Sequence, residues 1–226
     1  MRPTLRFACL TAAALLTLSG VARGQGAQNA PPKAPSRIGL RAYAIVDLDA
    51  VAAKASFDAA LRNSHLNAFG AGVDVTGIWK HVFARVAFTR ARETGSRVFV
   101  NNGEVFQLGI PLTITLTPIE AGAGWRFVSK KGSRVTPYAG LAFLSMGYTE
   151  VSSFAQSGED TSGRFKGQAL FGGVDAAIVK WLFASGEVQY RRVPHALGAG
   201  GVSKDFNESD IGGVTARLTI GIRTKR

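Results

Sequence analysis

The sequence has little cysteine and histidine, few acidic residues, and no long hydrophobic run after its first segment. Its 226 residues include one cysteine, which excludes a disulfide framework and a zinc site built on several cysteines. Acidic residues number 15 against 27 lysines and arginines, giving a formal charge of +12. Hydrophobic residues make up 46%, too many for a disordered basic tail. No later stretch approaches the roughly 18 uninterrupted apolar residues of a transmembrane helix.

Residues 1–24 have the pattern of a cleaved secretory signal. Arg2 and Arg6 precede an apolar run that contains Cys9, and a small-x-small site ends at Gly24. The run is shorter than the ~20 residues that span a bilayer, which disfavours an uncleaved anchor. Residues 25–36 carry three prolines and indicate an extended linker. The folded part, residues 37–226, is therefore expected to contain no cysteine.

From residue 37 onward, apolar and polar residues alternate with the period of two that is typical of strands with two unlike faces. In the last such segment Leu218 and Ile220 share one face, while Arg217 and Thr219 lie on the other. Two segments are less regular: 136–150 is apolar on both faces and 165–179 is mixed. Eight strands are predicted, at 37–49, 66–79, 81–93, 113–127, 136–150, 165–179, 181–193 and 210–224.

The joints between these segments alternate in length. Short joints are predicted at 80, 129–134 and 180, whereas long polar joints fall at 50–65, 94–112, 151–164 and 194–209. In the first long joint a short helical turn is predicted at Ser56–Leu61. Short turns at one end and long loops at the other are typical of outer-membrane barrels. The predicted fold is all-β, an eight-stranded antiparallel up-and-down transmembrane barrel with short periplasmic turns and long extracellular loops.

A soluble lipocalin-type barrel would show the same alternation with its apolar face inside, so it is the rival fold. Three observations favour the membrane barrel, and the third is the charged polar face described in the next paragraph. The segments are longer than ordinary strands and long enough to cross a bilayer at a tilt. Trp79, Trp125 and Trp181 all fall beside short turns, which predicts a periplasmic aromatic girdle at the lipid–water interface.

The polar face carries charges of both signs in nearly equal number. Because an eight-stranded barrel is only wide enough for side chains to fill it, these charges predict a paired interior plug rather than an open pore. The predicted interior charge network comprises Arg41, Asp47, Asp74, Arg85, Glu120, Arg126, Asp175, Glu187, Arg191 and Arg217, with Glu93 on the same face.

Three stretches resemble a known family. They are Thr136-Pro137-Tyr138-Ala139-Gly140, Phe171-Gly172-Gly173-Val174-Asp175, and the closing run 213–222, Gly-x-x-Ala-Arg-Leu-Thr-Ile-Gly-Ile. With the architecture over 37–226, they are similar to the outer-membrane protein β-barrel domain family, the small barrels of the OmpA, OmpX and OmpW type. The resemblance implies a bacterial outer-membrane location reached through the periplasm. It also implies outer-membrane lipids and the barrel-assembly machinery as partners, and we expect a monomer.

No catalytic, cofactor-binding or metal-binding residues are predicted. A serine–histidine–acid site could be imagined from Ser64, His65 and Asp58, but no serine and histidine share a strand face at i, i+2. Paired loop acids, such as Asp205 with Glu208, lack the ordered ligand series of a calcium site. The chain is therefore expected to be non-enzymatic and to use no cofactor.

Four basic residues form a second candidate site. Arg90, Arg92, Lys166 and Arg192 stand at the loop-side ends of strands, on the lipid-facing side by parity. Lipopolysaccharide phosphates lie at that height in an outer membrane, and arginine suits phosphate bidentately. This predicts a lipopolysaccharide contact; the alternative is an ordinary basic interface.

The net positive charge suggests nucleic-acid binding until it is sorted by position. Most of it falls at the turn end and the termini, where it suits anionic phospholipid head groups, so no nucleic-acid partner is expected. The leading interpretation is a structural or surface-interaction role for a plugged barrel, whose surface ligand the sequence does not identify. The alternatives are a narrow channel or transporter for small solutes and, less favoured, a lipid-modifying barrel enzyme.

Overall fold

A computed structural model describes residues 38–127, 133–152, 160–197 and 201–224. The predicted signal and linker, 1–24 and 25–36, lie outside the described residues. So do most of the predicted turn at 129–134 and part of the loop at 151–164. The barrel extends over almost all of the described chain.

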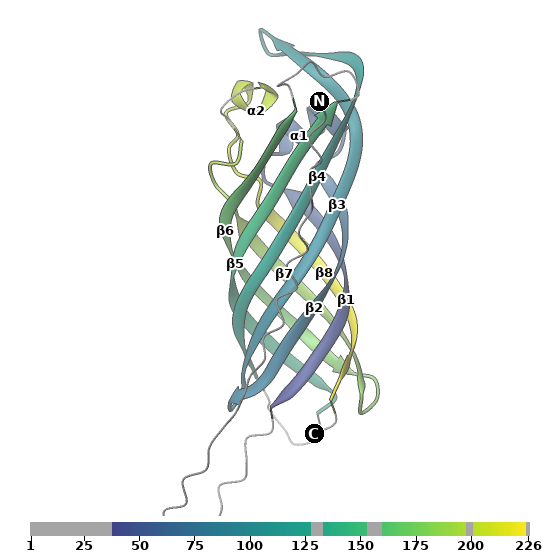
Figure 1. The fold of residues 1–226 in the computed structure, drawn as a ribbon, viewed down its shortest axis with the longest axis vertical. Coiled ribbons are helices and arrows are strands. Elements are labelled where there is room, and N and C mark those ends of the chain that lie inside the picture. Colours follow the sequence, from purple (N-terminus) through teal and green to yellow (C-terminus); the bar gives the residue numbers. More distant parts are fainter. Residues whose placement is uncertain (1–37, 128–132, 153–159, 198–200, 225–226) are drawn as a thin grey trace, which may run out of the picture. The chain divides into compact units, whose positions relative to one another are not determined.

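Eight antiparallel strands, each paired with its neighbours in sequence, close into a barrel because the first strand pairs with the last (Figure 1). The fold class is as predicted from the sequence. The strands are β1 (Gly39–Val51), β2 (His65–Trp79), β3 (Val82–Asn101), β4 (Glu104–Arg126), β5 (Val135–Ser152), β6 (Thr161–Ala177), β7 (Leu182–Arg192) and β8 (Gly213–Arg223).

The prediction of a long loop at 94–112 is wrong, because these residues are mostly strand. β3 and β4 continue as one long hairpin, and Asn101 pairs with Glu104 across the two-residue turn Asn102-Gly103. Both turn residues have positive φ, 51° and 84°, which is the backbone of the hairpin turn that Asn-Gly favours. The hairpin extends past the other strands at the top of Figure 1. The other strand ends differ from the prediction by at most four residues.

Two short helices lie in the loops at the same end as this hairpin, which we call the loop end. The helical turn expected at Ser56–Leu61 is part of α1 (Lys54–Leu61), and α2 (Gly201–Asp205) lies between β7 and β8. The Glu208 carboxylate accepts hydrogen bonds from the backbone N–H groups of Ala55 and Ser56, at 3.0 and 2.8 Å, so it caps α1 from the β7–β8 loop. Within the described residues, no helix is long and apolar enough to cross a membrane.

Short connections lie at the opposite end, which we call the turn end. Lys80 and His81 join β2 to β3, and residues 178–181 join β6 to β7. Lys80 has a positive φ of 45°, and the β2–β3 register shifts between Thr76 and Trp79. Register shifts of this kind are common at the rims of barrels, and this one lies beside the short turn between β2 and β3.

Candidate functional site

The barrel interior near the turn end contains six charged side chains, which we call the lower ion cluster. Arg41 donates to both oxygens of Asp175, at 2.9 and 3.0 Å, and lies 3.4 Å from Asp74. Arg85 bridges Asp74 and Glu187. The members are Arg41, Asp74, Arg85, Arg126, Asp175 and Glu187, three cations and three carboxylates.

A second group, the upper ion cluster, lies nearer the loop end. Arg217 is 1% exposed and makes paired contacts with Asp47, both at 2.8 Å, and with Glu120, at 2.8 and 2.9 Å. Arg191 contacts Asp47, Asp49 and Glu120 at 2.8–3.0 Å. Two arginines therefore face three buried carboxylates, Asp47, Asp49 and Glu120.

Gln189 joins the two clusters. Its amide donates to Glu187 of the lower cluster at 2.7 Å, and its oxygen accepts from Arg191 of the upper cluster at 2.8 Å. Gln189 is itself fully buried. The charged side chains therefore form a continuous hydrogen-bonded column inside the barrel.

Aromatic rings enclose the lower ion cluster. The Arg41 guanidinium lies 3.6 Å from the ring centroid of Phe183, and that of Arg85 lies 4.8 Å from the centroid of Phe171. The Tyr43 hydroxyl donates to Asp74 at 2.8 Å. Rings on the inner face hold the guanidinium groups by cation–π attraction and fill the space between them.

All ten residues of the predicted interior network face inward and take part in ion pairs. Sequence reasoning missed Asp49, which contacts Arg191 and accepts from the Thr215 hydroxyl. The signal was available, since Asp49 continues the face of Arg41 and Asp47. Glu93 shares the inward parity of Arg85 but lies half-buried near the loop end, away from both clusters.

The interior changes character above the upper ion cluster. On β4, the inward residues toward the loop end are Leu116, Ile114 and Leu112, each at most 4% exposed. The outward residues over the same stretch are Thr117, Thr115 and Thr113. From Glu120 toward the turn end the polarity of the two faces is the opposite, with Glu120 inward and Ala121, Ala123 and Trp125 outward. This reversal explains why 136–150 has apolar residues on both faces: the polarity of each face switches part-way along the strand.

The outer wall below the reversal carries a broad exposed apolar band. Phe143 is 79% exposed and Leu141 66%, although both are large and apolar. Monomeric soluble proteins rarely expose apolar patches beyond a few hundred Å². Other exposed members are Leu40, Val46, Leu48, Phe69, Val73, Val86, Phe88, Leu170, Val174, Val188, Leu218, Ile220 and Ile222.

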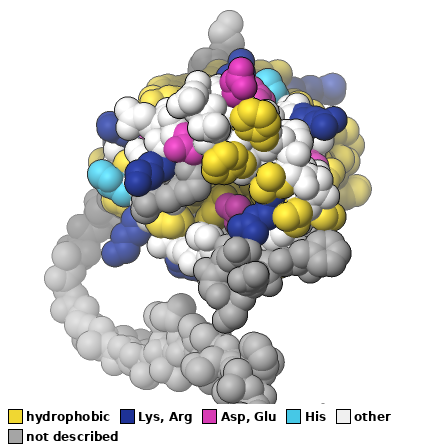
Figure 2. Space-filling model, turned by 90° about the horizontal axis from the view of Figure 1, so that it is seen from above, with side chains coloured by type: hydrophobic (Ala, Val, Ile, Leu, Met, Phe, Trp, Pro, Cys, Tyr) yellow, Lys and Arg dark blue, Asp and Glu magenta, His cyan; other side chains and the backbone are white. Residues whose placement is uncertain are grey.

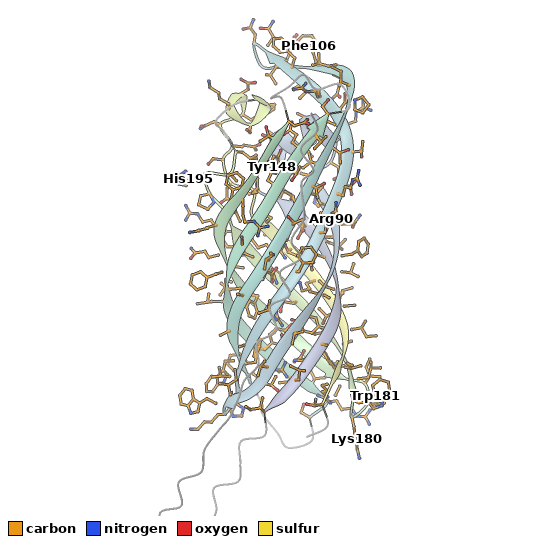
Figure 3. All side chains as sticks on the ribbon, viewed as in Figure 1. Arg90, Phe106, Tyr148, Lys180, Trp181 and His195 are labelled. Atoms are coloured by element: carbon orange, nitrogen blue, oxygen red, sulfur yellow. The ribbon has the colours of Figure 1, made fainter. Side chains whose placement is uncertain are left out.

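The three tryptophans all lie at the turn end. Trp79 and Trp181 are 64% and 51% exposed, and Trp125 contacts Trp79 edge-on with ring centroids 6.3 Å apart. Figure 3 labels Trp181 beside Lys180 at the end opposite Phe106, the hairpin residue. The three tryptophans therefore share one end of the barrel, and their role as an interfacial aromatic girdle stays a prediction.

The four basic residues predicted for lipopolysaccharide contact are exposed on the outer wall. They form two groups: Arg90 and Arg92 lie on β3, while Lys166 and Arg192 lie on β6 and β7. Two strands, β4 and β5, separate the groups. Sequence reasoning missed Arg164, which is also exposed on β6 and donates to Ser145 on β5 at 3.3 Å.

The imagined catalytic trio does not form a site. Ser64 is buried and its carbonyl accepts from the backbone of Val51, while His65 is exposed at the start of β2. Within the described ranges, no three His, Cys, Asp or Glu side chains are grouped to hold a metal ion.

No family model and no curated protein matches the sequence. Several solved structures match the fold. Neisserial surface protein A is 14% identical over 84% of this chain and 97% of that one, with a TM-score of 0.48. The chain is similar to small outer-membrane barrels. The N-terminal barrel domain of Pseudomonas aeruginosa OprF is 12% identical over 82% of this chain and 97% of that domain, with a TM-score of 0.47.

The Yersinia pestis attachment invasion locus protein Ail is 13% identical over 83% of this chain and 97% of its own, with a TM-score of 0.46. These identities and TM-scores are low, so the barrel is established by the strand pairing of this chain itself. They transfer no ligand, partner or activity.

Proposed function

We propose that this protein is a non-enzymatic outer-membrane barrel that is closed to solutes and acts through its exposed surface. The observation that carries the proposal is the pairing of an outward apolar band with inward ion pairs. An outward apolar face suits lipid, and charges in such a barrel belong in its lumen. The soluble lipocalin-type alternative needs the opposite arrangement, with apolar residues lining the lumen along its whole length.

Closure is supported by the density of the two ion clusters. Ten of their eleven charged side chains are 11% exposed or less, and Arg126 is 13% exposed. A permeating ion would have to separate arginine–carboxylate pairs that have no bulk water to replace them. Breaking one buried pair costs about 3–5 kcal/mol. The apolar side chains above the upper ion cluster add a second barrier to ions.

Planar-bilayer recording tests closure. Protein that migrates as a heat-modifiable band, and is therefore folded, is inserted into bilayers, and we expect no discrete conductance steps. Reproducible single-channel steps from such protein would instead establish the narrow channel. Extraction of the protein without detergent, and no heat-modifiable band, would contradict the membrane barrel itself.

We also propose that the outer basic residues contact lipopolysaccharide phosphates. Arg90, Arg92, Lys166 and Arg192 are exposed beside the upper edge of the apolar band, and Arg164 extends the group on β6. The test replaces the four predicted residues with glutamine and measures folding into vesicles with and without lipopolysaccharide.

The quadruple variant is expected to lose the acceleration that lipopolysaccharide gives to the unmodified protein. The matched control is Lys80→Gln with Lys180→Gln, which removes charge from the turn end and should leave the acceleration intact. Unchanged lipopolysaccharide-dependent folding of the quadruple variant would refute the contact.

A further inference from the structure

A cavity of about 930 Å³ lies at the loop end of the barrel, above the apolar part of the interior. Its floor includes Leu112 and Ile114 from β4 and Tyr148 from β5, and Phe57 of α1 forms part of its wall. All four side chains are 4% exposed or less. Figure 3 labels Tyr148 and His195 at this end, and Figure 2, which looks down on it, shows hydrophobic side chains gathered among charged ones.

The walls of the cavity are fastened together. Gln107 of the β3–β4 hairpin donates to the carbonyl of Ala59 in α1 at 2.9 Å. Glu208 caps the other end of α1 and accepts from the Ser56 hydroxyl at 2.7 Å. Gly95 of β3 lies so close to Ala60 that an added Cβ would fall 2.1 Å from its carbonyl oxygen. The helix is therefore held against the hairpin on one side and the β7–β8 loop on the other, as expected of a preformed pocket.

The cavity ends blindly toward the membrane. Below Leu112 and Ile114, Leu116 and Leu144 fill the interior, and the upper ion cluster follows at Glu120. A molecule that enters from the loop end therefore meets an apolar floor and then paired charges. The geometry suits binding and release at one mouth.

The chemistry of the lining identifies a class of ligand. Besides the floor residues, the apolar lining includes Val100, Phe165 and Leu197. The rim carries charges of both signs: Arg97 and Lys204 are basic, whereas Glu150 and Asp205 are acidic. Because these charges balance, a ligand with a net charge gains no overall attraction and would lose hydration. A lining that offers both donors and acceptors suits an uncharged, hydrogen-bonding head.

We propose that this cavity binds an uncharged amphipathic molecule, an alkyl chain with a hydroxyl head, whose chain contacts Leu112, Ile114 and Phe57. Its volume lies within the roughly 300–1,000 Å³ of small-molecule sites. The inference depends on the cavity alone and not on closure of the barrel or on lipopolysaccharide contact.

Photolabelling tests the site. An alkyl diazirine alcohol of about ten carbons, small enough for such a pocket, is irradiated with the full-length protein in lipid nanodiscs, and labelled peptides are mapped by mass spectrometry. We expect saturable label on the cavity residues of β4, β5 and α1. Unlabelled decanol should displace it, and decanoate should compete at least about tenfold more weakly, a difference of about 1.4 kcal/mol.

The variant Ala196→Trp places an indole in the cavity and should reduce this label at least about tenfold. The control Thr113→Trp adds the same indole on the outer face of β4, between the cavity residues Leu112 and Ile114, and should keep the label within about twofold. A heat-modifiable band shows that each variant folds. If Ala196→Trp does not fold, Ser203→Trp, at a lining residue of α2, replaces it.

Label found only on the outer wall, label that does not saturate, or equal labelling of Ala196→Trp and the unmodified protein would each overturn the site. Stronger competition by decanoate would overturn the uncharged head. None of these outcomes depends on whether the barrel conducts ions. The photolabelling experiment and the bilayer recording therefore test the cavity and the proposed function independently.

Discussion

Replacing Arg217 with methionine is expected to destabilise the barrel more than replacing Glu120 with glutamine, although these two side chains contact each other. The reason lies in the charge balance of the upper ion cluster. Two arginines there, Arg191 and Arg217, face the three carboxylates Asp47, Asp49 and Glu120. Removing one arginine leaves one cation against three buried carboxylates. Removing the charge of Glu120 leaves two of each sign.

The magnitude follows from burial. Arg217 is 1% exposed, and its loss leaves Asp47 and Glu120 without two charge-assisted contacts each. Leaving such a charge buried and uncompensated costs about 3–5 kcal/mol. Glu120→Gln keeps the shape of the side chain and relieves the excess of negative charge, so we expect a loss of about 1–2 kcal/mol, that of a weakened buried hydrogen bond. The double variant should be more stable than Arg217→Met alone, with a coupling energy of about 0.5–3 kcal/mol.

Urea unfolding in phospholipid vesicles, followed by fluorescence of the turn-end tryptophans, measures these differences. With a slope of about 2 kcal/mol per molar urea, Arg217→Met should lower the midpoint by about 1.5–2.5 M. The control Arg92→Met removes an exposed arginine from the same barrel and should shift the midpoint by less than about 0.5 M, as surface changes usually do. Equal midpoints for Arg217→Met and Glu120→Gln would refute the charge-balance reasoning.

Three further predictions concern other parts of the molecule. Leu218→Arg places a charge in the middle of the apolar band and should cost about 2–4 kcal/mol of folding free energy in vesicles. The control Thr113→Arg, above the band, should be tolerated. Equal losses of stability in the two variants would argue against lipid contact at Leu218. Gly103→Val forces a β-branched residue to positive φ at a cost of about 1–2 kcal/mol, so hydrogen exchange should accelerate in the β3–β4 hairpin and stay slow in the rest of the barrel. Glu208→Gln weakens the cap of α1 by about 0.5–2 kcal/mol, so trypsin should cleave the β1–β2 loop faster; an unchanged cleavage rate would show that the cap does not hold the helix.

Most of the fold could be predicted from the alternation of apolar and polar residues. A strand's period of two assigns each residue to one face of the sheet, whichever strand lies beside it. In the structure the predicted inward charges of β1, β2 and β7 are buried, and the basic residues of β3 and β6 on the opposite parity are exposed. The missed hairpin has a local cause. Its outer part is exposed on both faces, so alternation is weak there, and only the turn residues Asn102-Gly103 mark it.

The pairing inside the barrel was beyond what periodicity can predict. Asp47 and Arg217 are 170 residues apart in sequence and become neighbours because β8 pairs with β1 in one register, in which these two residues are direct partners. A shift of that register by one residue would turn Arg217 toward the outside. Composition indicates that charges balance, whereas only closure of the sheet decides which arginine meets which carboxylate.

The apolar interior of the loop end was missed for a related reason. A strand that runs from lipid into water changes its surroundings part-way, so the same parity that is polar near Glu120 becomes apolar at Leu116. Inside the apolar band the barrel has its charges within and its apolar residues without. Beyond the band it is arranged like a soluble protein, with threonines outward and leucines inward. The reversal therefore marks the upper edge of the outer apolar band, and it places the apolar cavity of the loop end above the column of ion pairs, with Leu116 and Leu144 between them.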